Sequence, residues 1–160
     1  MPFVHLYFGI ALARMSKQRE AEAEFEKEIE LEPEVAYGYD ELGAIYALRH
    51  EEETAAGYFR LALARDPRLA SAQFGLGDVL QRGGKFMEAL AALDAAEKLA
   101  PESRDVHYLR GRVLKRLGRD AESEKEFAEA QRLADSGLAR DEQVLREKVT
   151  PEPELRKAPD

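Results

Sequence analysis

Hydrophobic and polar residues follow one another along this chain with the 3.6-residue period of amphipathic helices. Ala21, Phe25 and Glu28 are four and three positions apart, so they lie on one stripe of a helix. Between residues 20 and 34 Glu alternates with other residues, a pattern that superficially suggests a strand. The intervening residues include Ala, Lys and Pro in place of β-branched residues, and Phe25 and Ile29 share a helical face. The pattern therefore predicts helices.

The helical pattern repeats every 34 residues, which predicts a chain built from successive copies of one unit. A glycine inside a helix costs about 1 kcal/mol relative to Ala, so a periodic glycine indicates that a partner helix approaches closely. A proline at the far end of each copy stops the second helix, and Gly83-Gly84 and Gly118 mark turns between paired helices. The recurring positions are Gly9, Gly43, Gly77 and Gly111; Ala21, Ala55, Ala89 and Ser123; Phe25, Phe59, Leu93 and Phe127; and Pro33, Pro67 and Pro101.

This set of residues resembles the signature of the tetratricopeptide repeat, which runs aromatic, Leu-Gly, Tyr, Ala, Phe, Pro over 34 residues. The resemblance covers residues 2–135 and implies an all-α fold, a right-handed α-solenoid of antiparallel helix pairs. Its four repeats would be 2–35, 36–69, 70–103 and 104–137.

The departures from the family signature are local. The aromatic position early in each copy is kept only as Tyr39; His5, Gln73 and His107 replace it elsewhere. We expect a structural role for both histidines, because each replaces a packing residue. Arg110 stands where an apolar residue is usual, and we expect only partial burial there because it lies in the last copy.

The two ends of the chain lead to different expectations. Residues 138–149 carry Leu138, Leu145 and Val149 on one face, which predicts a short capping helix over the last repeat. The segment 150–160 is rich in proline and charge, which predicts a disordered tail. The first helix is apolar nearly all round, which is typical of a buried helix. It either self-associates, or the chain is a piece of a longer protein with a preceding repeat. The self-association candidates are Phe3, Val4 and Phe8.

The resemblance also implies a concave groove, lined by the first helix of each pair, that holds an extended peptide or a partner helix. Along the groove the candidates run from apolar through acidic to basic, which suggests a ligand with an apolar and an acidic segment. The basic helix 104–119 has a second interpretation, a solvated face that balances the Glu-rich second helices. The groove candidates are Tyr7, Ile10, Arg14, Tyr37, Asp40, Glu41, Phe74, Asp78, Arg82, Tyr108, Arg112, Lys115 and Arg116.

Composition narrows the possible functions. The 160 residues carry 24 Lys and Arg against 32 Asp and Glu, and this acidity argues against nucleic acid as a partner. Without cysteine, neither disulfides nor thiolate metal sites can form. No apolar run approaches the roughly 20 residues that span a bilayer, so we expect no membrane insertion and, by default, a cytoplasmic location.

The sequence shows no constellation typical of an enzyme. His5 and His107 are 102 residues apart at the same repeat position, and His50 precedes three acidic residues in a turn. We therefore expect no catalysis, no cofactor and no metal. The sequence predicts a scaffold that binds a protein or peptide. A structural module that forms homo-oligomers through its first helix is the main alternative, and a carrier of lipid or a small molecule is a weaker one.

Overall fold

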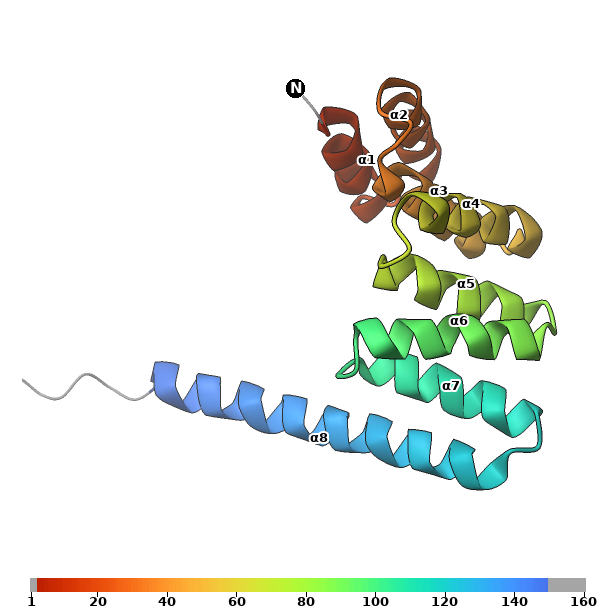
Figure 1. Ribbon diagram of the computed structural model, residues 1–160. Helices are drawn as coiled ribbons and strands as arrows, with labels where there is room; N and C mark the ends of the chain where they lie inside the picture. Colours follow the sequence, from red (N-terminus) through yellow and green to blue (C-terminus); the bar gives the residue numbers. More distant parts are fainter. Residues whose placement is uncertain (1–2, 150–160) are drawn as a thin grey trace, which may run out of the picture.

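The computed structural model describes residues 3–149, and within them every regular element is an α-helix (Figure 1). The all-α prediction is confirmed. The helices are α1 (Val4–Arg14), α2 (Gln18–Leu31), α3 (Ala36–Leu48), α4 (Glu52–Arg65), α5 (Ala70–Arg82), α6 (Phe86–Leu99), α7 (Arg104–Arg116) and α8 (Asp120–Val149).

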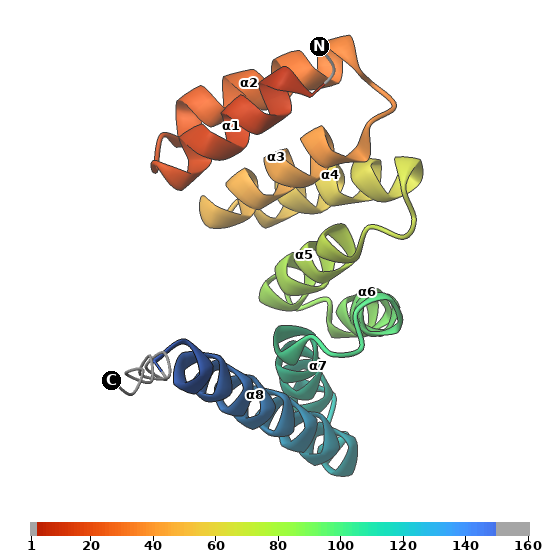
Figure 2. The same cartoon turned by 90° about the vertical axis from the view of Figure 1, so that its left-hand side faces the viewer.

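Consecutive helices pack as antiparallel pairs, α1 with α2, α3 with α4, α5 with α6 and α7 with α8. Each pair then packs on the next through the contacts of α2 with α3, α4 with α5 and α6 with α7. The first helices of neighbouring pairs also meet, so that α1, α3, α5 and α7 form a continuous row. Figure 2 shows the pairs stacked from α1 and α2 at the top to α7 and α8 at the bottom. This architecture is an α-solenoid.

The periodic glycines are the points at which paired helices come closest. A Cβ atom added to Gly43 would lie 2.7 Å from the ring of Phe59, and one added to Gly111 would lie 2.8 Å from Phe127. Carbon atoms in contact are normally about 3.5–4.0 Å apart, so even a methyl group does not fit without movement. The same contact joins Gly9 to Phe25 and Gly77 to Leu93. The interpretation of the repeating glycine as a site of close approach is confirmed.

The turn within each helix pair also follows the 34-residue period. Four residues with positive φ close these turns: Ser16 at 61°, His50 at 60°, Gly84 at 77° and Gly118 at 73°. The glycines adopt this left-handed backbone without strain, as their positions in the sequence predicted. Ser16 and His50 adopt it at the equivalent places in the first two pairs, although neither is a glycine.

His107 is a buried packing residue, as expected. Its Nδ1 lies 2.8 Å from Oε2 of Glu126, and its Nε2 lies 2.8 Å from the carbonyl oxygen of Pro101. Burial alone would lower the pKa of His107, but these two acceptors raise it above its usual value. In register with it, the hydroxyl of Tyr39 donates to the Pro33 carbonyl at 3.2 Å. Imidazole and phenol thus serve the same purpose, bonding the proline carbonyl between two helix pairs.

Arg110, at a position that is apolar in other copies, is partly buried between α6 and α8. Its guanidinium contacts Asp94 at 2.8 Å and Glu126 at 2.7 Å. Two carboxylates therefore compensate its charge, and the expectation of partial burial is confirmed.

The end of the chain differs from the expected short capping helix. Residues 138–149 continue α8 without a break, and the helix extends well beyond the neighbouring helix ends (Figure 1). Asp135 occupies the place where Pro33, Pro67 and Pro101 end the other second helices, so nothing interrupts α8. Leu138 is 65% exposed and does not cover the last pair. The side chains of Leu145 and Val149, and the tail predicted at 150–160, lie outside what the structure describes.

The close glycine contact gives a direct test of the packing. Gly43→Ala should destabilise the fold by about 1–3 kcal/mol, because the new methyl group overlaps the Phe59 ring. Gly57→Ala is the matched control, since a Cβ there meets nothing within 4 Å. Gly57 lies inside α4, so this change should stabilise by about 0.5–1 kcal/mol. Urea unfolding of both variants measures the difference, and equal effects would contradict this account of the glycine period.

Candidate peptide-binding groove

The row of first helices presents most of the predicted groove residues on its surface. Tyr7, Arg14, Tyr37, Tyr108, Arg112, Lys115 and Arg116 are exposed; Ile10, Glu41, Phe74, Asp78 and Arg82 are partly buried; Asp40 is buried. The row therefore carries exposed side chains from α1, α3 and α7 and half-buried ones from α5. Asp40 differs from the expectation of a freely accessible groove residue.

Each first helix contributes one aromatic side chain to this surface. Tyr7 is 70% exposed, Tyr37 51% and Tyr108 50%. Phe74, on α5, is partly buried against the hydrophobic core that α3 to α7 form. Tyr108 also packs against Phe127, with ring centroids 5.6 Å apart and planes tilted by 57°. Its ring is thus held at one face while the remainder stays accessible, which suits an anchoring side chain.

The middle of the row carries two neighbouring carboxylates on α3. Asp40 accepts a hydrogen bond from Oγ of Ser71 at 2.5 Å, which links α3 to α5. Burial raises the pKa of Asp40 above its usual range, although this hydrogen bond opposes the change. Burial, followed by repulsion from Asp40, raises the pKa of Glu41, while the charge of Arg14 lowers it. The middle of the groove therefore favours a neutral or cationic group on a ligand.

Arg82 performs a structural task. Its Nη1 donates to the carbonyl oxygen of Ala47 at 3.0 Å and to Glu52 at 3.3 Å, and its Nη2 lies 3.3 Å from Asp78. The guanidinium joins α5 to the preceding helix pair and neutralises Asp78. These two predicted groove residues form an ion pair with each other, which the sequence spacing alone did not reveal.

The basic end of the row contains two arginines without an ion pair. Within the described part of the chain, neither Arg112 nor Arg116 has a carboxylate within salt-bridge distance. Lys115, between them, pairs with Asp120 at 2.8 Å, and this contact raises the pKa of Lys115. Arg112 and Arg116 are therefore the cations on α7 that remain free to meet an anionic group.

A pocket of ≈ 200 Å³ opens where the N-terminal ends of α5 and α7 meet. Phe74, Ser71 and Asp105 line it together with residues of the loop that precedes α7. The sequence prediction did not include the loop residues, because the family signature marks only the helix positions. The small residues Ala100 and Ser103 on either side of Pro101 could have indicated an open space at this loop. The remaining lining residues are Ala70, Ala100, Ser103 and Val106.

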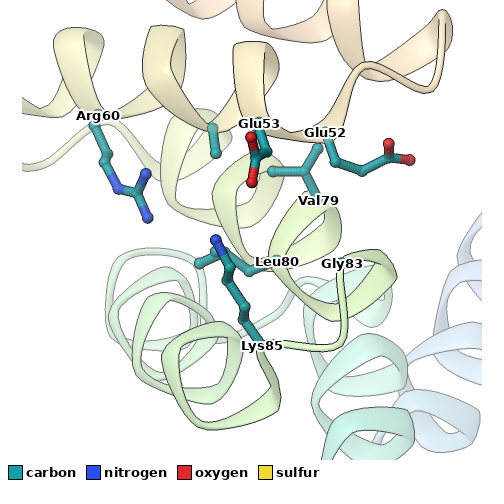
Figure 3. Close-up of a pocket in the computed structure, with 8 residues that line it drawn as sticks. Glu52, Glu53, Arg60, Val79, Leu80, Gly83 and Lys85 are labelled. Carbon is teal, nitrogen blue, oxygen red and sulfur yellow. The ribbon is translucent and has the colours of Figure 1, made fainter.

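A different pocket, of ≈ 290 Å³, lies between α4, α5 and the start of α6 (Figure 3). Figure 3 shows Glu53 and Arg60 projecting from α4 on the side that faces Lys85. None of the predicted groove residues lines this pocket. Because opposite charges share its wall, its surface shows no preference for one sign of ligand charge.

The three residues predicted for self-association lie in different environments. Phe3 is partly buried and packs on the core formed by α1, α2 and α3. Val4 is 47% exposed and Phe8 54%. Two of the three therefore belong to an open apolar face of α1, whereas Phe3 supports the fold.

The described part of the chain lacks the features of a metal site and of a membrane-spanning helix. Among residues 3–149, no group of three or more His, Asp or Glu side chains is placed to hold a metal ion. Within the same part of the chain, no helix is both long and apolar enough to cross a bilayer. His5 contacts only one carboxylate among them, that of Glu24 at 2.6 Å.

Comparison with known proteins gives a consistent classification. Residues 74–137 match the family model described as Tetratricopeptide repeat. The fold resembles that of MamA, with a TM-score of 0.76 and 21% identity over 84% of this chain and 79% of that one. A MamA fragment from Desulfovibrio magneticus RS-1 gives a TM-score of 0.74, with 23% identity over 85% and 77% of the two chains. No curated protein sequence matches the chain significantly.

A protein from another organism shows the same fold. PilF of Pseudomonas aeruginosa gives a TM-score of 0.74 at 24% identity, over 81% of this chain and 59% of that one. The match to the family model identifies residues 74–137 as tetratricopeptide repeat, and the helix pairs and close glycine contacts continue the same arrangement through α1 to α4. The boundaries of the four repeats, 2–35, 36–69, 70–103 and 104–137, stay a prediction.

The buried carboxylate of Asp40 predicts a stability that depends on pH. Its folded-state pKa is raised, so the folded state binds the proton more tightly than the unfolded state, and stability falls as pH rises above about 4. Asp40→Asn removes this charge and retains an oxygen acceptor for Ser71. The variant should melt at a higher temperature than the parent at pH 7, with a difference that shrinks toward pH 4.

The control for this experiment is Glu30→Gln, an exposed carboxylate on α2. Its melting temperature should follow that of the parent across the same range. A lower melting temperature for Asp40→Asn at every pH would instead show that the hydrogen bond, rather than the charge, dominates at this position.

Proposed function

We propose that this chain is a protein-interaction scaffold that holds a peptide or a partner helix along its row of first helices. The observation that carries the proposal is the exposed surface of α7, where a half-exposed Tyr108 stands one turn from the unpaired Arg112. Aromatic and arginine side chains dominate the energetics of protein interfaces. Solenoids built from such repeats provide extended binding surfaces, which supports the proposal.

The residues along the row favour a particular ligand chemistry. An apolar segment of the ligand would lie over Tyr7 and Ile10 at one end. At the other end an acidic segment would meet Arg112 and Arg116, whose guanidinium groups form charge-assisted hydrogen bonds with carboxylates. Between them, Glu41 favours a neutral or basic ligand residue because a second carboxylate is adjacent. The proposal is one of binding alone, and no cofactor, metal or nucleic acid takes part in it.

Selection from a displayed library of random peptides tests this function. The parent chain should enrich peptides in which an aliphatic segment and an acidic segment are separated by several residues. Arg112→Glu should weaken binding of those peptides by roughly ten- to a hundredfold, because it removes a charge-assisted contact of about 1.5–3 kcal/mol. Tyr108→Ala should also weaken binding, through the lost aromatic contact.

The matched control is Lys98→Glu, which makes the same charge reversal on α6, away from the row of first helices. It should leave peptide affinity unchanged. Equal losses for Arg112→Glu and Lys98→Glu would show that net charge governs capture, and the groove proposal would then be wrong. The folded state of each variant is verified first by circular dichroism.

A second candidate function is assembly. It rests on the open apolar face of α1, where Val4 is 47% exposed, Phe8 54% and Met15 65%. Contiguous exposed apolar surface marks an interaction site. In this function α1 forms contacts between copies of the chain, and the groove serves the assembled form or is left empty.

A further inference from the structure

The outer face of α1 occupies positions that are covered in every later pair. Val4, Phe8 and Ala11 are exposed, and they lie on one stripe of the helix. Residues 34, 68 and 102 positions further on are buried, apart from the partly buried Arg110. In α3, α5 and α7 they are Gly38, Leu42 and Ile45; Ala72, Leu76 and Val79; and Val106, Arg110 and Val113. The exposed stripe of α1 is thus the surface that a preceding helix pair covers elsewhere in this chain.

The internal junctions show what covers that surface. At the junction of α2 and α3, a Cβ added to Gly38 would lie 3.0 Å from Ile29. At the junction of α4 and α5, one added to Gly75 would lie 2.4 Å from the ring of Phe59. The first helix of each later pair therefore lies against the aromatic or aliphatic face of the preceding second helix.

At the opposite end of the solenoid, no helix among residues 3–149 covers the corresponding face. A pocket of ≈ 390 Å³ opens there between α7 and α8. Its wall contains Phe127, which is in register with Phe25, Phe59 and Leu93. Because α8 continues straight past Asp135, the described residues up to Val149 do not fold back over this pocket (Figure 1). The other lining residues are Arg104, Tyr108, Ala130, Gln131 and Ala134.

Two charged residues at opposite ends of the solenoid stand at the same repeat positions as an ion pair inside it. At the junction of the second and third pairs, Arg82 of α5 reaches Glu52 at the start of α4, with 3.3 Å between the groups. The residue 68 positions before Arg82 is Arg14, and the residue 68 positions after Glu52 is Asp120. Arg14 is exposed and has no carboxylate within salt-bridge distance among the described residues. Asp120 is exposed at the start of α8, where it pairs with Lys115, so Arg14 would join this pair as a second cation.

We propose that α1 of one copy docks on the α7–α8 face of a second copy and so continues the solenoid from one molecule into the next. In this contact Val4 takes the place of Gly38 and Tyr7 the place of Gly75, so by register they lie against Gln131 and Phe127 of the second copy. Phe8 and Ala11 extend the apolar contact along the same helix. Arg14 then pairs with Asp120, as Arg82 pairs with Glu52. The inference rests on the second candidate function and requires no ligand in the groove.

The contact is heterologous, since it joins two different faces. Each added copy leaves one α1 face and one α7–α8 face open, so the association does not stop at a dimer unless the chain of copies closes into a ring. A symmetric contact between two α1 faces would stop at two copies. The number of copies and the two faces used therefore distinguish the modes of assembly.

Two blocked variants test the proposal. Val4→Glu places a charge on the α1 face, and Ala134→Glu places one in the α7–α8 pocket. Sedimentation velocity should show that the parent chain forms larger species as its concentration rises to about 100 μM, while each variant alone stays monomeric. An equimolar mixture of the two variants should form a one-to-one dimer and nothing larger, because one intact face of each kind remains.

Three outcomes would overturn the proposal. If Ala134→Glu alone still dimerises, the contact is symmetric between α1 faces. If the mixture of variants stays monomeric although the parent associates, the two faces do not meet. If the parent is monomeric throughout, a second copy is not the occupant, and a preceding segment of a longer chain becomes the candidate for covering α1. Gln131→Glu, at an exposed position, replaces Ala134→Glu should that variant not fold.

Charge reversal tests the register itself. Arg14→Glu should weaken association by roughly three- to tenfold, and adding Asp120→Arg in the partner should restore it. Arg112→Glu separates this inference from the groove proposal, because it should weaken peptide capture and leave assembly intact. Val4→Glu should show the reverse, with assembly lost and peptide capture retained.

Discussion

The rest of the structure depends on the contact between a glycine of each first helix and the ring or branched side chain of its partner. Because Gly43 has no Cβ, the ring of Phe59 approaches the α3 backbone. Phe59 in turn lies against Gly75 of the next pair, so one ring fixes both the geometry within a pair and the stacking between pairs. A contact that serves two junctions at once propagates along the chain, which explains why the solenoid extends by addition of similar units.

This double role of one side chain also explains which parts of the fold could be predicted from the sequence. Positions such as Ala55 and Phe59 are packed on two sides, which restricts the residue types they can hold. The 34-residue period is therefore strong at these positions. It predicted the helices, their pairing and the fold class correctly. The turns at Ser16 and His50 left no such signal, because the left-handed backbone is imposed by the helices on either side. The expectation of a separate capping helix at 138–149 was wrong because Asp135 replaces the proline that ends the other second helices, so α8 continues and leaves Leu138 exposed.

The sequence predicted which face of each first helix carries the candidate groove, but it predicted less well which side chains on that face are free to bind a ligand. Helical register places Asp78, Arg82 and Arg112 on the exposed side of their helices, but the structure exposes only Arg112 and leaves the other two partly buried. Register does not say which charges already have partners, because those partners come from other pairs of helices. Arg82 bonds to Ala47 and Glu52, which lie 35 and 30 residues earlier in the chain. Arg112 has no carboxylate within salt-bridge distance among the described residues. Only the three-dimensional arrangement distinguishes a cation that holds the solenoid together from one that is free to bind a ligand.

The groove and the two ends of the solenoid obey different constraints. Most of the predicted groove residues, unlike the buried Asp40, lie on a face that the neighbouring pairs leave at least partly open, and their chemistry varies from Tyr37 to Asp78 to Arg112 along the row. Residues at the ends occupy positions that every internal junction buries, and they retain the side chains of a junction, such as Phe8 in α1 and Phe127 in α8. An exposed side chain that still has the character of a buried position indicates a covering partner. The proposed docking of α1 on α7 and α8 follows from this difference, because it completes at the ends the same contact that holds the interior together.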